Sequence, residues 1–204
     1  MNVLISLVLI PTSITTEYVD VALMATVEPG TSQRIVAADV VFGWDPSALR
    51  FVGVDNSGAI PALWSGVPTG PQGEYTGINE TVPPADGTGM YWWLGQLGIP
   101  MIVSQSVKLT TFRYAVIDNS TVTDLVLIPD LTVDYPGETV VYGSNVGGTD
   151  VTGDLVNTTV SLCSCDLNKD SFIDSADLTM ALAEWTPASN TLLAEILGSW
   201  GPCN

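Results

Sequence analysis

Residues 1–162 alternate short apolar segments with turns rich in glycine and proline, and this pattern limits the possible folds. Many short strands joined by such turns predict a sandwich or a barrel. The stretch Ile60–Gly89 is rich in Pro, Gly, Thr and Asn, so we expect it to be irregular. The expected strands are Glu17–Val27, Ile35–Trp44, Leu49–Val54, Met90–Leu94, Val107–Ile117, Val122–Ile128, Leu131–Val133, Thr139–Tyr142 and Leu155–Leu162.

The N-terminal segment Val3–Ile10 is an apolar run that no lysine or arginine precedes. A secretory signal has a positively charged start and a cleavage site of small residues. The run is also too short for a transmembrane helix. We therefore expect a buried β-strand ended by Pro11, with no Sec signal peptide and no membrane insertion.

The net charge argues against nucleic-acid binding, and the absence of histidine and of catalytic motifs argues against enzymatic activity. The chain has 22 acidic and 5 basic residues, a net charge of −17, and it has no histidine. Binding to nucleic acid needs clustered lysine and arginine, so nucleic acid is not an expected partner and divalent cations are the natural counterions. Without histidine the commonest general base is missing, and no nucleophile elbow or phosphate-binding loop is present. We expect no enzymatic activity.

The segment Val36–Val54 contains the sequence Trp44-Asp45-Pro46-Ser47 followed by Leu49, between two apolar stretches. Proline fixes φ in such a turn, and the Asp and Ser side chains can satisfy nearby amides. This segment resembles the one that marks cohesin domains and related carbohydrate-binding-module sandwiches, and the resemblance extends over about residues 3–162. It implies a mostly β fold, a jelly-roll β-sandwich. It does not identify a partner, because such folds host several binding functions.

The composition changes near Cys163, and the segment Asp166–Asp177 has the spacing of an EF-hand-type calcium loop. Such loops place oxygen ligands at positions 1, 3, 5, 7, 9 and 12. Ser171 stands at position 6, where EF-hands have glycine, so the turn is expected to cost about 1 kcal/mol. The expected Ca²⁺ ligands are Asp166, Asn168, Asp170, the Phe172 carbonyl, Asp174 and Asp177.

The stretch Asp166–Trp185 is similar to a dockerin repeat, which has a calcium loop followed by one helix. The sequence around Leu178–Pro187 recurs at Leu193–Pro202 without room for a second loop. Two short helices are therefore expected, each with an apolar face. These faces either pack together as a helical hairpin or dock a partner, and the interaction candidates are Leu182, Trp185, Leu197 and Trp200.

Cysteines and aromatic residues leave alternatives open. A disulfide between Cys165 and Cys203 could clasp the C-terminal module, with Cys163 left over or substituting, because pairing does not follow from sequence. Among Trp44, Trp64, Tyr91, Trp92 and Trp93, core packing is the first interpretation. Alternation along a strand would nevertheless place Trp92 outside while its neighbours are buried, where it could stack on a sugar.

The sequence thus predicts a β-sandwich, residues 1–162, followed by a small calcium-loop and two-helix module, residues 163–204. The expected function is a calcium-binding structural or interaction protein that assembles with a protein partner or with itself. A virion surface component, a capsid decoration or fibre, and an extracellular protein are the two expected settings. The alternative is a carbohydrate-binding adhesion module.

Overall fold

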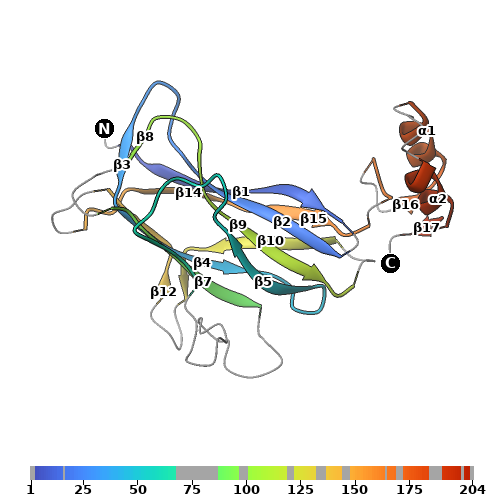
Figure 1. Cartoon of the computed structure of the whole chain (residues 1–204), viewed down its shortest axis with the longest axis horizontal. Helices are drawn as coiled ribbons and strands as arrows, with labels where there is room; N and C mark the ends of the chain where they lie inside the picture. The colour runs from blue at the N-terminus through green and yellow to red at the C-terminus, as the bar shows by residue number, and fades with distance from the viewer. Residues whose placement is uncertain are drawn as a thin grey trace.

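The computed structural model describes residues 3–15, 17–67, 87–96, 101–118, 122–131, 137–143, 148–163, 165–168, 172–183, 190–198 and 200–202. Two β-sheets pack face to face in this part of the chain, and two short helices lie beyond one end of the sandwich (Figure 1). No helix among the described residues is long and apolar enough to cross a membrane.

The first sheet has five strands in the order β14-β1-β2-β9-β5. Neighbouring strands run antiparallel, except that β1 and β14 are parallel. The strands are β1 (Ile5–Ile14), β2 (Tyr18–Thr26), β5 (Leu49–Asp55), β9 (Val107–Val116) and β14 (Thr152–Val156).

The second sheet has the order β15-β10-β4-β7-β6, with β13 also paired to β4. Two strand pairs lie outside the main sheets, β3 (Gln33–Ile35) with β8 (Met101–Val103) and β11 (Asp130–Leu131) with β12 (Gly137–Glu138). The strands of the sheet are β4 (Ala37–Gly43), β6 (Trp64–Gly66), β7 (Thr88–Leu94), β10 (Val122–Ile128), β13 (Val140–Tyr142) and β15 (Thr158–Ser161).

The core lies between the sheets and is centred on aromatic side chains. Phe42 of β4 stacks on Phe112 of β9 with ring centroids 4.4 Å apart, and so joins the two sheets. Trp44, Phe51 and Tyr114 pack around this pair. Trp44 therefore belongs to the core, as its first interpretation predicted.

The predicted turn at Asp45–Ser47 is confirmed. Oδ1 of Asp45 accepts hydrogen bonds from the N–H (2.8 Å) and Oγ (2.6 Å) of Ser47. The carbonyl of Asp45 accepts the N–H of Leu49, the first residue of β5. The polar groups of the turn are therefore satisfied within the turn and need no partner strand. The chain can leave one sheet at the end of β4 and enter the other at β5.

Several strand predictions need correction. Strand β6 (Trp64–Gly66) lies within Ile60–Gly89, which we expected to be irregular. The expected strand Ile35–Trp44 is divided at Val36, because Ile35 ends β3 and Ala37 begins β4 in another sheet.

The expected strand Leu155–Leu162 is two strands, because the chain passes from the first sheet to the second at Asn157, whose Oδ1 accepts the N–H of Leu127 (2.8 Å). Strand β1 does not end at Pro11 but continues, with a register shift, to Ile14. The pairing of β1 with β14 stops at Val8, so Pro11 removes no hydrogen bond from that ladder.

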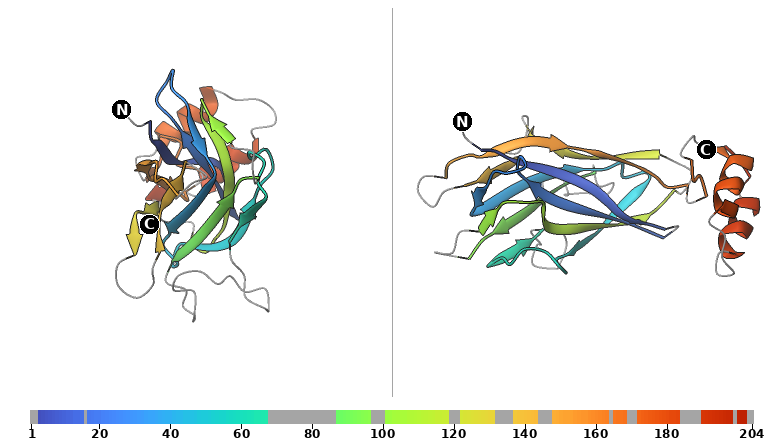
Figure 2. Two further views of the ribbon diagram at one scale, coloured as in Figure 1. Left: turned by 90° about the vertical axis from the view of Figure 1, so that its left-hand side faces the viewer. Right: turned by 90° about the horizontal axis from the view of Figure 1, so that it is seen from above.

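The C-terminal residues form α1 (Ser175–Ala183), α2 (Asn190–Gly198) and a small pairing of β16 (Phe172–Ile173) with β17 (Gly201–Pro202). The two predicted helices are thus confirmed. Seen from above, they lie beyond the end of the long strands (Figure 2). Their buried cluster of Cys165, Ile173, Ala181 and Ile196 is separate from the sandwich core, whose last described member is Leu162.

Candidate functional site

The acidic loop begins and ends on buried carboxylates. Asp166 is 6% exposed and Asp177 is fully buried, whereas Asn168 and Phe172 are exposed and Asp174 is half-buried. Asp170, the central expected ligand, lies outside the described residues together with Lys169 and Ser171. The structure therefore describes five of the six predicted ligand residues.

Asp177 ties the end of the loop to its beginning. Its Oδ1 accepts the backbone N–H of Leu167 (2.6 Å) and of Asn168 (3.1 Å), and its Oδ2 accepts that of Asp174 (2.9 Å). Burial raises the pKa of Asp177, but the backbone hydrogen bonds outweigh it and leave the pKa below its usual value. The carboxylate is thus held in its charged form.

Asp174 and Asp177 also cap helix α1. Oδ1 of Asp174 accepts the N–H of Ala176 (2.7 Å), while the Asp177 carboxylate accepts the N–H of Asp174. Asp174 thus caps the first turn through the N–H of Ala176, and Asp177 reaches back to the N–H of Asp174 as the third helical residue does in a capping box. Both residues therefore have a structural role that does not require a metal.

The donor chemistry of the loop fits calcium, a hard cation that takes six to eight oxygen ligands. Carboxylate, amide and carbonyl oxygens are the predicted donors, and the buried Asp166 and Asp177 bring negative charge into the loop. In the described part of the chain no three Asp, Glu or Cys side chains gather as a metal site. Calcium binding thus stays a prediction, and it depends on how Asp170 completes the donor set.

The cysteines follow the alternative pairing. Cys163 is disulfide-bonded, whereas Cys165 carries a buried thiol within the helical module. The predicted disulfide between Cys165 and Cys203 is therefore wrong, because Cys163, the alternative, is the cysteine that forms one. Cys203 lies outside the described residues. A reason is visible in the packing, since Cys165 belongs to the small core with Ile173, Ala181 and Ile196.

The two helices pack against each other, with Leu178 and Leu193 of the predicted faces partly buried in their contact, but the rest of each predicted face, where the structure describes it, does not take part. Leu182, Leu197 and Trp200 are 54%, 61% and 52% exposed, and Trp185 lies outside the described residues. The helices instead bury Ala181 and Ile196. Because the loop holds Asp177 inside, Ala181 one turn later also faces inward, and Leu182, about 100° further round the helix, faces outward. We call Leu182, Leu197 and Trp200 the helical patch.

A second exposed apolar surface lies on the outer face of the second sheet. Trp92 is 39% exposed while Tyr91 and Trp93 are buried, as the alternation predicted. Trp64 lies beside Trp92 with ring centroids 5.7 Å apart, and the ring planes are tilted by 50°. We call Trp64, Trp92 and Leu94 the aromatic patch. Its rings are not coplanar, so they do not form a flat platform for a sugar.

Asp39, which we did not single out from the sequence, lies opposite Trp92 on β4. Burial raises its pKa, and so does the negative charge of Glu138. The aromatic patch therefore has an acidic border. An isolated Asp in an otherwise apolar strand was the signal in the sequence.

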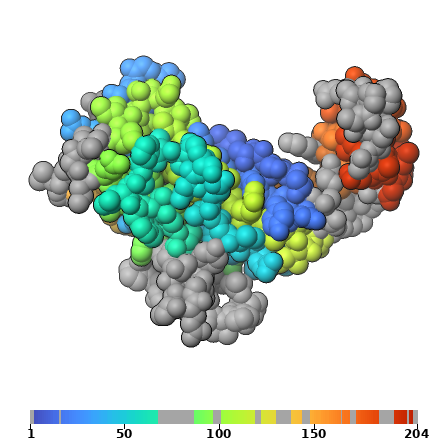
Figure 3. Space-filling model, in the orientation of Figure 1, coloured from blue at the N-terminus to red at the C-terminus, as the bar shows by residue number. Residues whose placement is uncertain are grey.

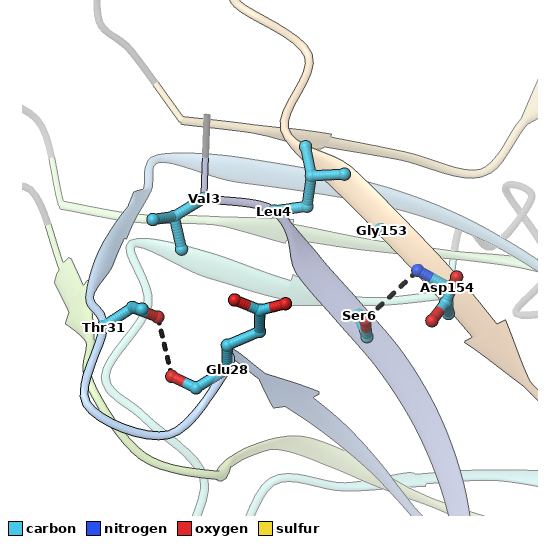
Figure 4. A pocket seen from close by; sticks show the side chains of 7 residues that line it. All are labelled: Val3, Leu4, Ser6, Glu28, Thr31, Gly153 and Asp154. Atoms are coloured by element: carbon cyan, nitrogen blue, oxygen red, sulfur yellow. Dashed lines mark hydrogen bonds between the residues drawn. The ribbon is translucent and has the colours of Figure 1, made fainter. Parts of the chain in front are cut away.

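A pocket of about 310 Å³ lies where β1 meets β14, at the end of the sandwich that carries the N-terminus (Figure 4). Glu28 and Asp154 line it, together with Val3, Leu4 and Ser6. The Asp154 N–H donates to Oγ of Ser6 (3.1 Å). No residue predicted as functional lines this pocket.

No model of a known protein family and no curated protein matches this sequence. Solved cohesin structures match the fold. A cohesin module from a family 33 glycoside hydrolase of Clostridium perfringens has a TM-score of 0.50 at 11% identity, covering 78% of this chain and 96% of that one.

Two structures of complexes match similarly. One is a type I cohesin–dockerin complex from Clostridium thermocellum (TM-score 0.53, 13% identity, 78% and 98% covered). The other is the third cohesin of ScaC with the ScaB dockerin from Acetivibrio cellulolyticus (TM-score 0.53, 13% identity, 77% and 97% covered). This chain thus has a cohesin-like β-sandwich fold.

Proposed function

We propose that this chain is a non-enzymatic interaction protein, in which a cohesin-like sandwich carries a calcium-stabilised helical module that docks on a protein partner. The helical patch is the observation that supports this proposal. Its three members, out of four predicted contact residues, are each more than half exposed on a very small module. Large apolar side chains left exposed in one small region mark interaction sites, and all three belong to the short C-terminal module. Two of the similar solved structures are complexes of a cohesin with a dockerin, which supports a protein partner here.

We place the boundary between two domains at 162/163. Two separate hydrophobic clusters support it, one ending at Leu162 and one that includes Cys163 and Cys165. A segment of about 40 residues rarely folds without a metal or a disulfide. Deleting residues 163–204 should therefore leave a folded β protein with weakened assembly, which circular dichroism and light scattering can measure.

Calcium would be held by Asp166, Asn168, Asp170, the Phe172 carbonyl, Asp174 and Asp177. It would neutralise carboxylates that otherwise repel one another and so stabilise the folded module. The single pair of helices would then present the helical patch in a fixed arrangement. The disulfide bond of Cys163 is a second constraint on the same module.

Carbohydrate binding is the second candidate function, after protein binding. The exposed pair Trp64 and Trp92 is the feature that favours it, and the 50° tilt between their rings counts against it. Catalysis has no support from the residues: the chain has no histidine, and we assign no general base or nucleophile. The setting of the assembly, extracellular or on a virion surface, can be determined by immunogold imaging of the native source.

Charge substitution in the helical patch tests the proposal. Leu182→Lys with Leu197→Lys should reduce the assembled mass measured by light scattering in calcium, without lowering the melting temperature, because both side chains are exposed and lysine suits the last turn of a helix. Ile102→Lys on β8 is the matched control, since Ile102 is also an exposed apolar residue but lies on the sandwich. Equal assembly by all three proteins would reject the helical patch as the docking surface.

A further inference from the structure

Asp177 is the most enclosed of the acidic side chains that the structure describes in the loop. It is fully buried, whereas Asp166 is 6% exposed and Asp174 is half-buried. The helical module projects beyond the end of the sandwich (Figure 3), and its buried cluster is separate from the sandwich core. The backbone groups that hold the Asp177 carboxylate belong to this module, at Leu167, Asn168 and Asp174.

These hydrogen bonds use most of the acceptor capacity of the carboxylate. An ionised carboxylate has two oxygens and about four lone-pair sites. Oδ1 of Asp177 accepts two N–H groups, from Leu167 (2.6 Å) and Asn168 (3.1 Å), so both of its sites are used. Oδ2 accepts one N–H group, from Asp174 (2.9 Å), and keeps one site. Asp177 can therefore offer one lone pair to a cation without losing a hydrogen bond.

Two features favour keeping these hydrogen bonds when a cation binds. A bond from a backbone N–H to a carboxylate is charge-assisted and stronger than a neutral one. An N–H group that loses its acceptor in a buried place is also costly. Two of the donors belong to the beginning of the loop and the third to the residue before α1, so their loss would open the loop. A metal bond from Oδ1 would require one of these bonds to break.

An EF-hand loop uses its twelfth residue in another way. A glutamate at that position gives two oxygens to calcium. Asp177 occupies the same position, but its side chain is one methylene shorter. The length of the side chain and the hydrogen bonds on its oxygens both argue against a two-oxygen contact here.

We propose that Asp177 acts mainly as a positioning residue of the loop and gives calcium a single oxygen, Oδ2; this inference rests on the calcium binding proposed above. The site then has one protein oxygen fewer than an EF-hand, and water takes that place. Ligand charge and rigidity tune the affinity of such loops, and extracellular modules lie at the weak end, at about 10⁻⁴–10⁻³ M. We expect the dissociation constant of this loop in that range.

The same ligand count reduces the preference for calcium over magnesium. Calcium accepts six to eight oxygens, whereas magnesium requires octahedral geometry and keeps several waters. A one-oxygen contact at Asp177 lowers the coordination number toward six, and a water in the vacated place suits magnesium. Millimolar magnesium should therefore compete with calcium for this loop.

Two measurements on the full chain test the proposal. Calorimetric titration with calcium, without and with millimolar magnesium, gives the affinity and the selectivity. Luminescence lifetimes of Eu³⁺ in H₂O and in D₂O count the waters on the bound ion, and they report the missing oxygen directly.

Asp177→Glu supplies the methylene that a two-oxygen contact needs. It should remove one water from the bound Eu³⁺ and tighten calcium binding by roughly tenfold. It should also lower the melting temperature in chelator, because the longer side chain cannot keep the three N–H groups. Asp154→Glu is the matched control, since it adds the same methylene to an exposed carboxylate on β14 and should change none of these values.

The outcomes separate this inference from the proposed function. Micromolar calcium binding that millimolar magnesium does not disturb, or an equal water count in the wild type and Asp177→Glu, would show a two-oxygen contact; the inference is then overturned while calcium binding stands. No heat at millimolar calcium rejects the calcium site, and the inference with it. If circular dichroism shows that Asp177→Glu does not fold, the affinity of the wild type and its competition with magnesium decide.

Discussion

Asp177 and Asn168 are joined by a hydrogen bond of 3.1 Å, from the backbone N–H of Asn168 to Oδ1 of Asp177. This bond ties the first turn of α1 to the start of the acidic loop, whether or not a metal is bound. It also fixes the rotation of α1, so that Ala181 is buried and Leu182 is exposed. The surface available to a partner is thus set by one buried carboxylate.

Substitutions at the two buried carboxylates should separate the structural role from the metal role. Asp177→Ala removes backbone hydrogen bonds and half of a capping box, so it should destabilise the module by about 1–2 kcal/mol with calcium and with chelator. Asp166→Ala should lower the melting temperature only when calcium is present. Calorimetric titration of the full chain with calcium checks the premise, and no binding at millimolar calcium would contradict it.

Gly87 should be intolerant of substitution. Its φ is +79°, and an added Cβ would lie 2.1 Å from the carbonyl oxygen of Trp44. The N–H of Trp44 donates a hydrogen bond to the Gly87 carbonyl (2.7 Å), so the two backbones are held together. Gly87→Ala should therefore cost about 2 kcal/mol or more. Gly30→Ala is the control, with φ +80° but no atom within 4 Å, and it should cost about 1 kcal/mol. Equal losses in urea denaturation would contradict the account of this turn.

Trp92 and Trp93 should differ sharply although they are adjacent. Trp93→Ala removes a buried side chain and should cost about 3–5 kcal/mol, whereas Trp92→Ala removes one that is 39% exposed and should cost much less. Chemical denaturation of both variants measures the difference. A large loss from Trp92→Ala would show that the aromatic patch is structural.

Asp39→Asn should stabilise the protein at neutral pH. Burial and Glu138 raise the pKa of Asp39, so its contribution to stability is complete below its unfolded pKa of about 4 and is lost as pH rises through the folded pKa. The urea midpoint should therefore increase at pH 7 and change little at about pH 3. The reverse pH dependence would show that Asp39 has a favourable partner.

Asp45→Asn should act in the opposite direction. The hydrogen bonds of Ser47, first from its side chain and then from its backbone, lower the pKa of Asp45. The stability that this carboxylate contributes is present above its unfolded pKa and is lost as pH falls through the folded pKa. Urea midpoints should therefore fall slightly at pH 7 and converge with those of the wild type in acid.

Much of the fold could be predicted from local pattern. The strand Val122–Ile128 alternates clearly, and the turn at Asp45 carries its own hydrogen bonds. The switch at Asn157 was not predicted, because a single polar residue between two apolar stretches looks like one interrupted strand. The pairing of Phe172–Ile173 with Gly201–Pro202 joins distant residues and has no local signal.

The candidate site was predicted less completely. The spacing of Asp166, Asp174 and Asp177 predicted the acidic loop. It did not predict the hydrogen bonds from the loop backbone to Asp177 that fix the rotation of α1. The ion pair of Arg113 with Asp20 was not predicted at all, since these residues are far apart in sequence and meet only through the register of β2 with β9. Pairing between strands is a property of the fold, which sequence spacing does not contain.

The most direct test of the account is the mass of the full chain in solution, measured by sedimentation velocity over increasing protein concentration with calcium and with chelator. Species heavier than the monomer should form in calcium, increase with protein concentration and revert to the monomer in chelator. A chain that stays strictly monomeric at high concentration in calcium, and that binds no surface of its native particle or matrix, would contradict this prediction and would place carbohydrate binding first.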